Sequence, residues 1–544
     1  MSHRIVFGKR DEFINVVCPI EQFITMSIDN IPTNSDPPSV SASRSPSPEI
    51  TVAPPSPSEE SNSSTEFSIE QQPAGTLSKD GESERRHTNM GLPGHDFTYF
   101  LLSEEEISTE LSRLSAPKII NNGALHTASL QPHPAKHSQD RLVAEQWDLG
   151  ERGSWKFRAV FDGHANGDET VDHVFTTLPS EIRSSLTTLS VPQCTNVEAV
   201  SSLLQETISV IDNSIKQGVL DLFPSSDYID QLSDDEIRAI VNDKSTVVPL
   251  TIGLPTLANK YAGRGPNNII VTRAMRGTTV LVVLINSDGG LWTASLGDCQ
   301  AVLGQKESSF WTTTLLSTNH NASEPSEVAR LKLDHPGEEE SVVAKNRVLG
   351  LIAVTRAIGD HQFKLPSIYT KRVFSLTIPG MNRPDHTQII MKRNLTPPYV
   401  SGIPEVKYVK LHDGARGLSH PQVFPEATHI DTNSWKEACL FMCSDGLLDL
   451  YGGENWQEKH IDIAELCKTW VDLVGEKLDS SSQNFDPKEN LALFLLNRGL
   501  RGPPRSYSGE IWSEEEALNR VSSLLTLEFK DKWMDDTTVL VEIL

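Results

Sequence analysis

Residues 157–167 read FRAVFDGHANG, and this stretch decides how the rest of the chain is interpreted. A short apolar run ends in Asp162, Gly163 and His164. A buried strand of this kind delivers a carboxylate, an open backbone carbonyl and an imidazole together at its carboxyl end, which suits a metal site. An Asp-Gly pair after a strand is more often only a tight turn. The stretch alone therefore leaves both interpretations open.

Three more aspartates lie beside apolar runs far along the chain. Asp298 stands in SLGDCQAVL, Asp445 in FMCSDGLLDL and Asp535 in DDTTVLVEI. Each alone is most simply a turn or cap residue. Aspartates at several strand ends can, however, converge at one edge of a sheet core, where carboxylates bind hard divalent cations. Two neighbouring ions of this kind activate water and clamp a phosphoryl group.

The apolar patterns predict strands interleaved with helices. TTVLVVLI at 278–285, a turn containing Asp-Gly-Gly and LWTASL predict a hairpin. Residues 438–443 and 537–544 are further strands. Apolar residues at helical spacing predict a helix over 104–114, with Ser103 as its N-cap. Further helices are predicted over 168–186, 197–222, 324–333, 463–478, 488–500 and 513–530.

The composition excludes several classes of protein. The chain has 544 residues and a formal net charge of −25, from 48 Lys and Arg against 73 Asp and Glu. This charge argues against nucleic-acid binding and against an anionic membrane surface. No apolar run approaches the roughly eighteen residues of a membrane span. Six scattered cysteines without a CxxC pair argue against disulfides and zinc sites, and indicate an intracellular protein.

The chain divides into two regions by composition. Residues 1–95 are mostly rich in Ser and Pro, which predicts disorder, and residues 96–544 contain the folded domain. Insertions are expected near 224–268, which is irregular and acidic, and near 361–435, which is rich in loops. The acidic residues near the N-terminus make a poor mitochondrial presequence. They favour the cytoplasm or nucleus, unless translation starts at Met26 or Met90.

Five motifs occur in the order found in the metal-dependent protein serine/threonine phosphatases (PPM, or type 2C), which this chain resembles. They are FDGH, SLGDCQAVL, LGLIAVTRAIGD, FMCSDGLLDL and DDTTVLVEI. STNHNASEPSEVARLKLDHPGEEE and PPYVSGIPEV are most similar to the pyruvate dehydrogenase phosphatases. The resemblance implies an α+β fold, an α-β-β-α sandwich of two antiparallel sheets flanked by helices. It also implies hydrolysis of phosphoserine and phosphothreonine by a metal-bound hydroxide, without a covalent phosphoenzyme.

The same resemblance implies a site for two Mg²⁺ or Mn²⁺ ions, with a third, weaker ion beside them. Asp162 bridges the first two ions, and the Gly163 carbonyl binds the second. Asp445 and Asp535 complete the shell of the first ion.

Three further roles are implied by the resemblance. Asp140 acts through metal-bound water, and Asp298 binds the third ion. His164 protonates the leaving oxygen of serine or threonine, which suits an imidazole near neutral pH. Asp162 and His164 are thus the catalytic candidates.

Two departures from the family pattern concern how phosphate and the second ion are held. Gln139 stands where the family often has Glu, so it can bind a metal water but adds no charge, and we expect a weaker second site. Ala135 stands where many members have a phosphate-binding arginine, and Lys136 or Arg141 could take over part of its work. These departures support an alternative, a pseudophosphatase that acts as a phosphoprotein-binding scaffold.

Substrates and location follow only from the resemblance. We expect phosphoprotein substrates, and regulatory partners that bind through the 361–435 excursion, because long excursions on a rigid core often carry specificity. The likeness to pyruvate dehydrogenase phosphatases favours the mitochondrion, in contrast to the acidic N-terminus.

Overall fold

A computed structural model describes most of the chain from Glu84 onward. The described ranges are 84–90, 94–244, 263–307, 309–381, 384–411, 438–453, 461–484, 489–502 and 513–544. Most of the region expected to be disordered, 1–83 and 91–93, lies outside the described residues, as do 245–262 and 412–435 of the two expected insertions. Within 84–100, β1 (Arg85–Thr88) pairs with β2 (Phe97–Phe100).

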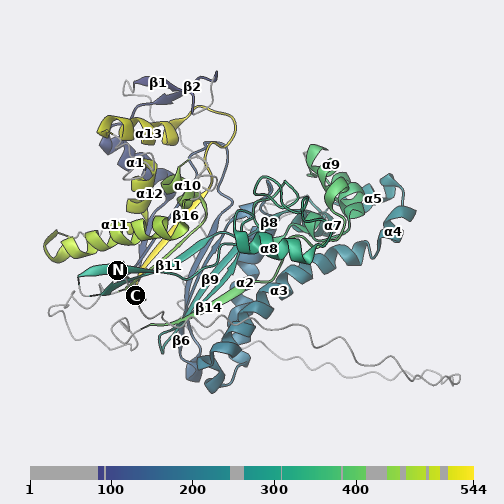
Figure 1. Ribbon diagram of the computed structural model, residues 1–544, viewed down its shortest axis with the longest axis horizontal. Helices are drawn as coiled ribbons and strands as arrows, with labels where there is room; N and C mark the ends of the chain where they lie inside the picture. Colours follow the sequence, from purple (N-terminus) through teal and green to yellow (C-terminus); the bar gives the residue numbers. More distant parts are fainter. Residues whose placement is uncertain are drawn as a thin grey trace, which may run out of the picture.

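Two antiparallel sheets form the centre of the molecule (Figure 1). The first has the order β14-β10-β9-β6-β5, and the second has the order β12-β11-β15-β16-β4-β3. The strands of the first sheet are β5 (Arg141–Asp148), β6 (Ser154–Phe161), β9 (Val280–Asn286), β10 (Gly290–Leu296) and β14 (Glu405–Lys410). Those of the second are β3 (Lys118–Ile120), β4 (Leu125–Leu130), β11 (Gln300–Glu307), β12 (Phe310–Leu315), β15 (Ala438–Cys443) and β16 (Thr537–Ile543).

The apolar runs of the central strands are explained by burial on both faces. Along β9, Val280, Val282 and Leu284 pack towards the helices, whereas Leu281 and Val283 face the second sheet. Successive side chains of a strand point to opposite faces, so a strand covered on both sides must be apolar throughout. The layer between the sheets joins the second set to residues of β15 and β16 such as Leu440, Met442 and Leu540.

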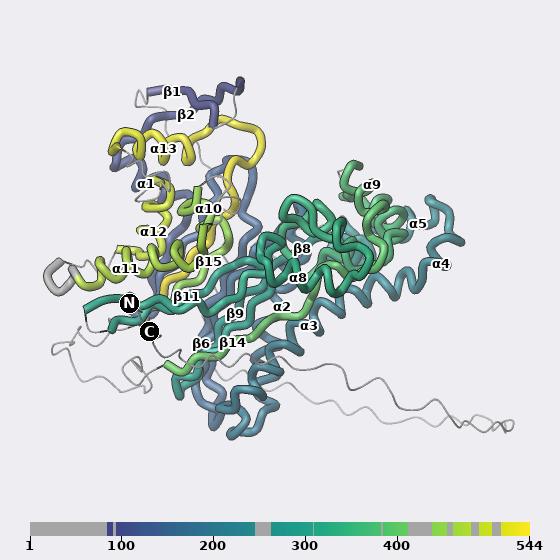
Figure 2. The backbone as a smooth tube through the Cα atoms, viewed as in Figure 1, coloured from purple at the N-terminus to yellow at the C-terminus, as the bar shows by residue number. Residues whose placement is uncertain are grey.

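Helices cover the outer face of each sheet (Figure 2). The first sheet is covered by α2 (Glu169–Thr188), α3 (Val197–Leu222) and α7 (Pro266–Met275). The second is covered by α1 (Glu104–Ser115), α10 (Gly446–Gly452), α11 (Ile463–Asn484), α12 (Leu491–Leu500) and α13 (Glu514–Thr526). This arrangement confirms the predicted sandwich of two antiparallel sheets flanked by helices. Ser103 caps α1, as predicted, and accepts a hydrogen bond from the Glu106 backbone N–H.

One buried ion pair ties the two sheets together. Arg158 is the only charged residue in the apolar run before Asp162, and it donates two hydrogen bonds to Glu542 of β16, at 2.8 and 2.9 Å. Both side chains are 1% exposed. Lys156 Nζ also contacts Glu542, at 3.0 Å, so two cations of β6 meet this one carboxylate of β16 and join the first sheet to the second.

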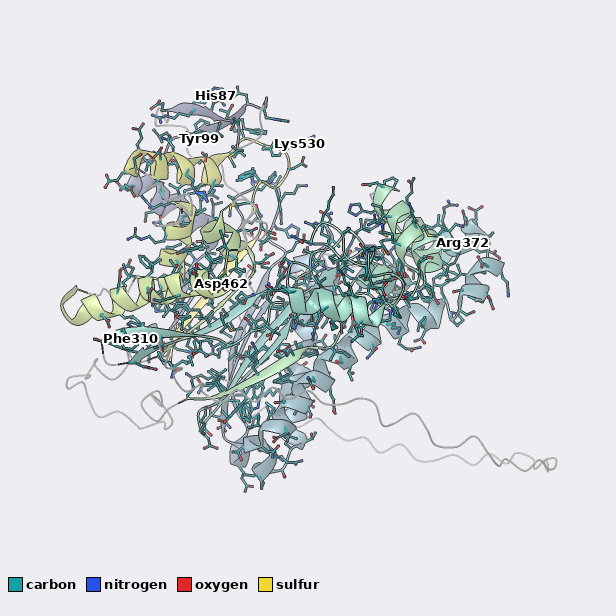
Figure 3. The ribbon with its side chains drawn as sticks, in the orientation of Figure 1. His87, Tyr99, Phe310, Arg372, Asp462 and Lys530 are labelled. Carbon is teal, nitrogen blue, oxygen red and sulfur yellow. The ribbon has the colours of Figure 1, made fainter. Side chains whose placement is uncertain are left out.

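The expected insertions contain regular structure where they are described. Residues near 224–268 were predicted to be irregular, but they form α4 (Ser226–Gln231), α5 (Asp234–Val241) and the start of α7. Within 361–435 lie a π-helical turn, η5 (Tyr369–Phe374), and α9 (Pro384–Arg393). Arg372, labelled in Figure 3, donates hydrogen bonds to the Ile229 and Leu232 carbonyls, at 2.8 and 2.7 Å, and so joins the two insertions.

Another part of 361–435 belongs to the core and not to a surface excursion. Strand β14 (Glu405–Lys410) is the edge strand beside β10, with Val406 paired to Ala294. Its six residues mix apolar and charged side chains and follow a proline-rich stretch, so the strand signal in the sequence was weak. Helix α8 (Pro325–Asp334) matches the predicted helix at 324–333.

A third, small sheet lies beside the first. Its strands are, in order, β13 (Ile358–Gly359), β8 (Gly277–Thr278) and β7 (Gly163–His164). It brings the FDGH stretch next to the VTRAIGD motif. Among the helices the structure describes, none is both long enough and apolar enough to cross a membrane.

His126 is a buried, neutral histidine between β4 and α12. Its Nε2–H donates to the Gly123 carbonyl at 3.0 Å, and its Nδ1 accepts from the Leu491 backbone N–H at 3.3 Å. A second proton, bound to Nδ1, would point at the Leu491 N–H and remove this hydrogen bond. Burial accordingly lowers the pKa of His126 to about 4, although the bond to Gly123 acts in the opposite direction.

We therefore expect acid to destabilise the protein through His126. Between about pH 6.5 and pH 4 the unfolded chain binds this proton and the folded chain does not, so stability falls as the pH falls, by up to roughly 3 kcal/mol. Urea unfolding at several pH values measures this slope. His126→Gln should reduce it, whereas His95→Gln, at an exposed position, should leave it unchanged. Equal slopes in His126→Gln and the unsubstituted protein would show the interpretation to be wrong.

Candidate functional site

The predicted site residues lie where strands of both sheets begin or end. Asp162 follows β6, and Asp140 precedes β5, which pairs with β6 so that Arg141 lies opposite Phe161. In the second sheet, Asp445 follows β15 and Asp535 precedes β16. The two strands are antiparallel, so the end of β15 lies beside the start of β16, and the two aspartates lie at the same end of the sheet.

Three carboxylates form a compact group at this edge. Oxygen atoms of Asp162, Asp298 and Asp445 all lie within 4.8 Å of one another. Asp298 comes from the turn between β10 and β11 and joins the group directly, although the resemblance gave it only a third, weaker ion. Asp140 and Asp535 lie beside the group and not within it.

The donor set fits divalent cations. One oxygen of each of Asp140, Asp298 and Asp445 is buried and has no hydrogen-bond partner. A buried carboxylate oxygen without a partner is costly unless a cation or donor satisfies it. Burial, followed by the charges of neighbouring carboxylates, raises the pKa of both Asp162 and Asp445 well above its usual range. Oxygen ligands of this density are those that Mg²⁺ and Mn²⁺ bind.

Gly163 is placed where no larger residue fits. A Cβ atom there would lie 2.7 Å from the Gln139 carbonyl oxygen and 2.8 Å from the Val171 side chain. The close contact holds the turn after β6 against α2 and against the loop before β5.

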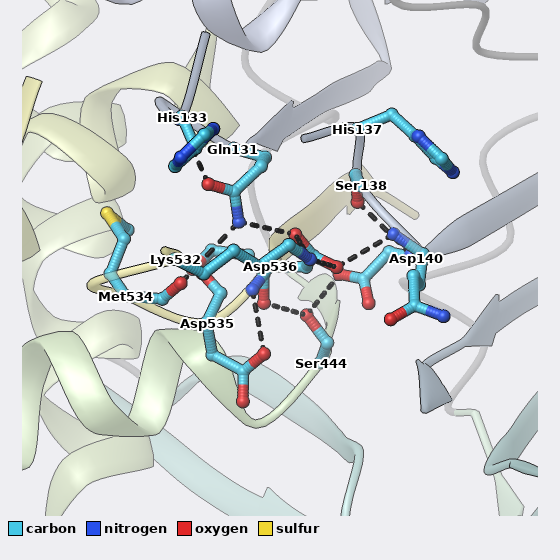
Figure 4. Close-up of polar contacts among 12 residues, drawn as sticks. Gln131, His133, His137, Ser138, Asp140, Ser444, Lys532, Met534, Asp535 and Asp536 are labelled. Atoms are coloured by element: carbon cyan, nitrogen blue, oxygen red, sulfur yellow. Dashed lines mark hydrogen bonds and ion pairs between the residues drawn. The ribbon is translucent and has the colours of Figure 1, made fainter. Parts of the chain in front are cut away.

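Asp140 is held by the strand on the opposite sheet (Figure 4). Its Oδ2 accepts a hydrogen bond from the Ser444 hydroxyl at 2.7 Å. The Ser444 oxygen in turn accepts from the Thr538 backbone N–H at 2.9 Å. One oxygen of Asp140 is thereby fixed, and the other is left for a water or cation.

Asp536 is a structural acid that the sequence analysis did not single out. Its carboxylate accepts hydrogen bonds from the Gln131 side-chain amide at 2.6 Å and from the Gln139 backbone N–H at 2.7 Å. Lys532 Nζ donates to both of its oxygens, at 2.9 and 2.8 Å. It fastens the loop before β5 to the start of β16 (Figure 4). Two adjacent aspartates gave no sign of which one is exposed; the structure exposes Asp535 and buries Asp536.

Gln139 and Arg141 are both committed to structural contacts. The Gln139 side-chain amide donates to the Gly167 carbonyl at 2.8 Å instead of pointing to a metal water. Arg141 is paired with Asp172 at 2.7 Å, and it donates to two backbone carbonyls, those of Ser138 and Asp140. Arg141 is therefore not the substitute for the missing arginine, whereas Lys136 is exposed on the loop before β5.

His164 lies at the edge of the carboxylate group and contacts Asp360. Its Nε2 is 2.5 Å from Asp360 Oδ2. Burial lowers the pKa of His164, but the charge of Asp360 and the hydrogen bond to it outweigh this effect, so that the pKa is raised overall. Asp360 is the last residue of VTRAIGD; the motif was visible in the sequence, but only the fold shows which side chain its aspartate meets.

The chain matches a known family over part of its length. Residues 260–456 match the family model described as protein phosphatase 2C. Protein phosphatases of this family depend on metal ions, and an acidic cluster is present here. The match confirms the resemblance to the type 2C phosphatases.

Curated relatives extend the match. A mitochondrial pyruvate dehydrogenase phosphatase 1 from Bos taurus is 40% identical over 148 residues, which are 27% of each chain. Mitochondrial pyruvate dehydrogenase phosphatase 2 from Homo sapiens is 30% identical over 293 residues, covering 50% of this chain and 49% of that protein. A protein phosphatase 2C homolog from Schizosaccharomyces pombe is 24% identical over 396 residues, covering 72% and 74%. The chain thus spans about a quarter of the length of the bovine relative it matches.

The carboxylate group predicts a cation-dependent stability. Mg²⁺ or Mn²⁺ should raise the midpoint of thermal unfolding, because only the folded chain brings Asp162, Asp298 and Asp445 together. Asp445→Asn should remove most of this increase. Without metal, the same variant should unfold at a higher temperature than the unsubstituted protein, since it removes one of several like charges, with a gain of about 1 kcal/mol.

Differential scanning calorimetry with EDTA or with each cation measures both effects. The matched control is Asp235→Asn, because Asp235 is 93% exposed and belongs to α5, not to the carboxylate group. An equal cation response in the Asp445 and Asp235 variants would contradict a cation site at Asp445.

Proposed function

We propose that this chain, which is related to the protein phosphatase 2C family, is a metal-dependent protein serine/threonine phosphatase. The observation that carries the proposal is the group formed by Asp162, Asp298 and Asp445, within 4.8 Å of one another, at the joint edge of the two sheets. The match of residues 260–456 to the family model includes two of these aspartates. Nothing observed favours the pseudophosphatase alternative.

In this proposal the ions are held by the residues that the sequence predicted. Asp162, the Gly163 carbonyl, Asp445 and Asp535 would hold the two divalent cations directly. Asp140 acts through water, with its free oxygen. Asp298 holds a further ion. Divalent cations held there supply Lewis acidity to the attacking water and neutralise charge on the phosphoryl group.

The protein's own residues supply the remaining step. Attack of a water oxygen on phosphorus breaks the bond between phosphorus and the serine or threonine oxygen. His164 gives a proton to that departing oxygen, which is a poor leaving group as an alkoxide. The His164 side chain is 26% exposed, so a substrate at the edge of the sheets can reach it.

We also propose a substrate class and a compartment. The relatives named pyruvate dehydrogenase phosphatases favour phosphorylated pyruvate dehydrogenase or a similar protein as substrate, and a mitochondrial location. The relatives offer no support for the cytoplasm or nucleus. Mg²⁺ and Mn²⁺ both suit the oxygen ligands, and regulatory partners remain proposed for the parts of 361–435 outside β14. We retain the division into a Ser/Pro-rich region, 1–95, and a phosphatase domain, 96–544.

Hydrolysis of a phosphothreonine peptide tests the activity. Release of phosphate should require Mn²⁺ or Mg²⁺ and stop on addition of EDTA. Asp162→Ala and Asp445→Ala should each lower the rate by roughly 100-fold or more, because each removes a ligand at the centre of the site.

Asp235→Ala, at an exposed position, serves as the matched control and should keep full activity. If the folded protein shows no metal-dependent turnover, or if both ligand variants keep full turnover, the scaffold alternative gains and the enzyme proposal fails.

A further inference from the structure

Asp360 is a buried carboxylate that contacts the imidazole of His164. Its Oδ2 lies 2.5 Å from His164 Nε2, and the residue is 0% exposed. Its other oxygen accepts from the Gln362 side-chain amide at 3.1 Å. Both oxygens therefore have partners, and one of them is the imidazole of the proposed acid.

Backbone hydrogen bonds hold Asp360 in a left-handed conformation. Asp360 has a φ of +51°, in the left-handed region that few residues other than Gly, Asn and Asp occupy. Its N–H donates to the Arg276 carbonyl at 2.9 Å, and its carbonyl accepts from the Phe363 N–H at 2.9 Å. Such a conformation persists where its surroundings determine it, and it often marks a functional position.

A buried ion pair fixes the same loop from the other side. Asp212 of α3 accepts from the Gly359 backbone N–H at 2.9 Å and from Lys364 Nζ at 2.8 and 2.9 Å. Lys364 Nζ also donates to the Ala357 carbonyl at 2.7 Å. The loop that carries Asp360 is thus anchored to a long helix on the covered side of the first sheet.

Gly277 leaves the space in which the two side chains meet. A Cβ atom at Gly277 would lie 2.0 Å from Asp360 Oδ2 and 2.1 Å from His164 Nε2. The small sheet β13-β8-β7 thus brings together three sequence segments that build a single contact: the DGH turn, the RGTT segment and the VTRAIGD motif.

We propose that Asp360 is a positioning residue for the proton transfer by His164. This inference rests on the proposed phosphatase function. A carboxylate that accepts from Nε2–H keeps a proton on that nitrogen, so the proton that moves is the one on Nδ1. Asp360 also fixes the plane of the ring, while the departing oxygen takes the Nδ1 proton and His164 is left neutral.

A comparison of two leaving groups separates this role from a structural one. The leaving oxygen of a phosphothreonine peptide needs a proton, whereas p-nitrophenolate is stable as an anion near neutral pH. With Mn²⁺ present, Asp360→Asn should lower kcat on the peptide by about 10- to 100-fold, as loss of a positioning partner does. It should leave kcat on p-nitrophenyl phosphate nearly unchanged. Asparagine matches aspartate in shape and tolerates the left-handed backbone.

Three further variants complete the experiment. His164→Asn should show the same selective loss, and the double variant should be no slower than His164→Asn alone, because residues that act as a unit are not additive. Gly277→Ala changes no charge but forces the pair apart, and it should also lose peptide turnover selectively.

The outcomes distinguish this inference from the proposed function. If the unsubstituted protein hydrolyses neither substrate, the proposed function fails. If it is active, but Asp360→Asn and Gly277→Ala lose both substrates equally or keep full peptide turnover, the function stands and the positioning role of Asp360 is overturned.

Discussion

Repulsion among closely spaced carboxylates is the constraint on which the rest of the structure depends. Asp162, Asp298 and Asp445 are held within 4.8 Å of one another at the edge of an apolar sandwich, and Asp140 adds a further buried acid. Like charges in a medium of low polarity oppose folding unless they are protonated or bind cations. The free energy that brings them together must come from elsewhere, and burial of apolar side chains between the sheets and beneath the helices supplies it.

The two sheets place the carboxylates through register and not through local sequence. Each aspartate follows or precedes a strand, and antiparallel pairing puts the end of one strand beside the start of the next. A shift of one residue in β15 or β16 would turn its apolar side chains to the wrong face. Arg158 of the first sheet and Glu542 of the second form an ion pair between the sheets. The alignment of the sheets that pairs these two charges is therefore preferred over others.

Much of this arrangement could be predicted from the sequence, for a physical reason. Strands such as VLVVLI, buried on both faces, have a strong pattern, and Asp-Gly turns after them mark the strand ends. Strand β14 was missed because EVKYVK is a short edge strand of mixed apolar and charged residues. Contacts between distant side chains could not be predicted at all. Arg141 was a candidate for phosphate binding until the structure placed Asp172 beside it, and Asp360 needed the small third sheet before its partner could be known.

The position of β16 has a consequence for how the protein is made. This strand lies between β15 and β4 in the middle of the second sheet, although Thr127 and Leu540, which face each other, are 413 residues apart in sequence (540 − 127). During synthesis, β4 and β15 emerge from the ribosome before their shared neighbour exists, and both present unpaired edges until it arrives. The acids at the start of β16 arrive at the same moment. A nascent chain therefore gains its continuous second sheet and the acids at the start of β16 in one late event.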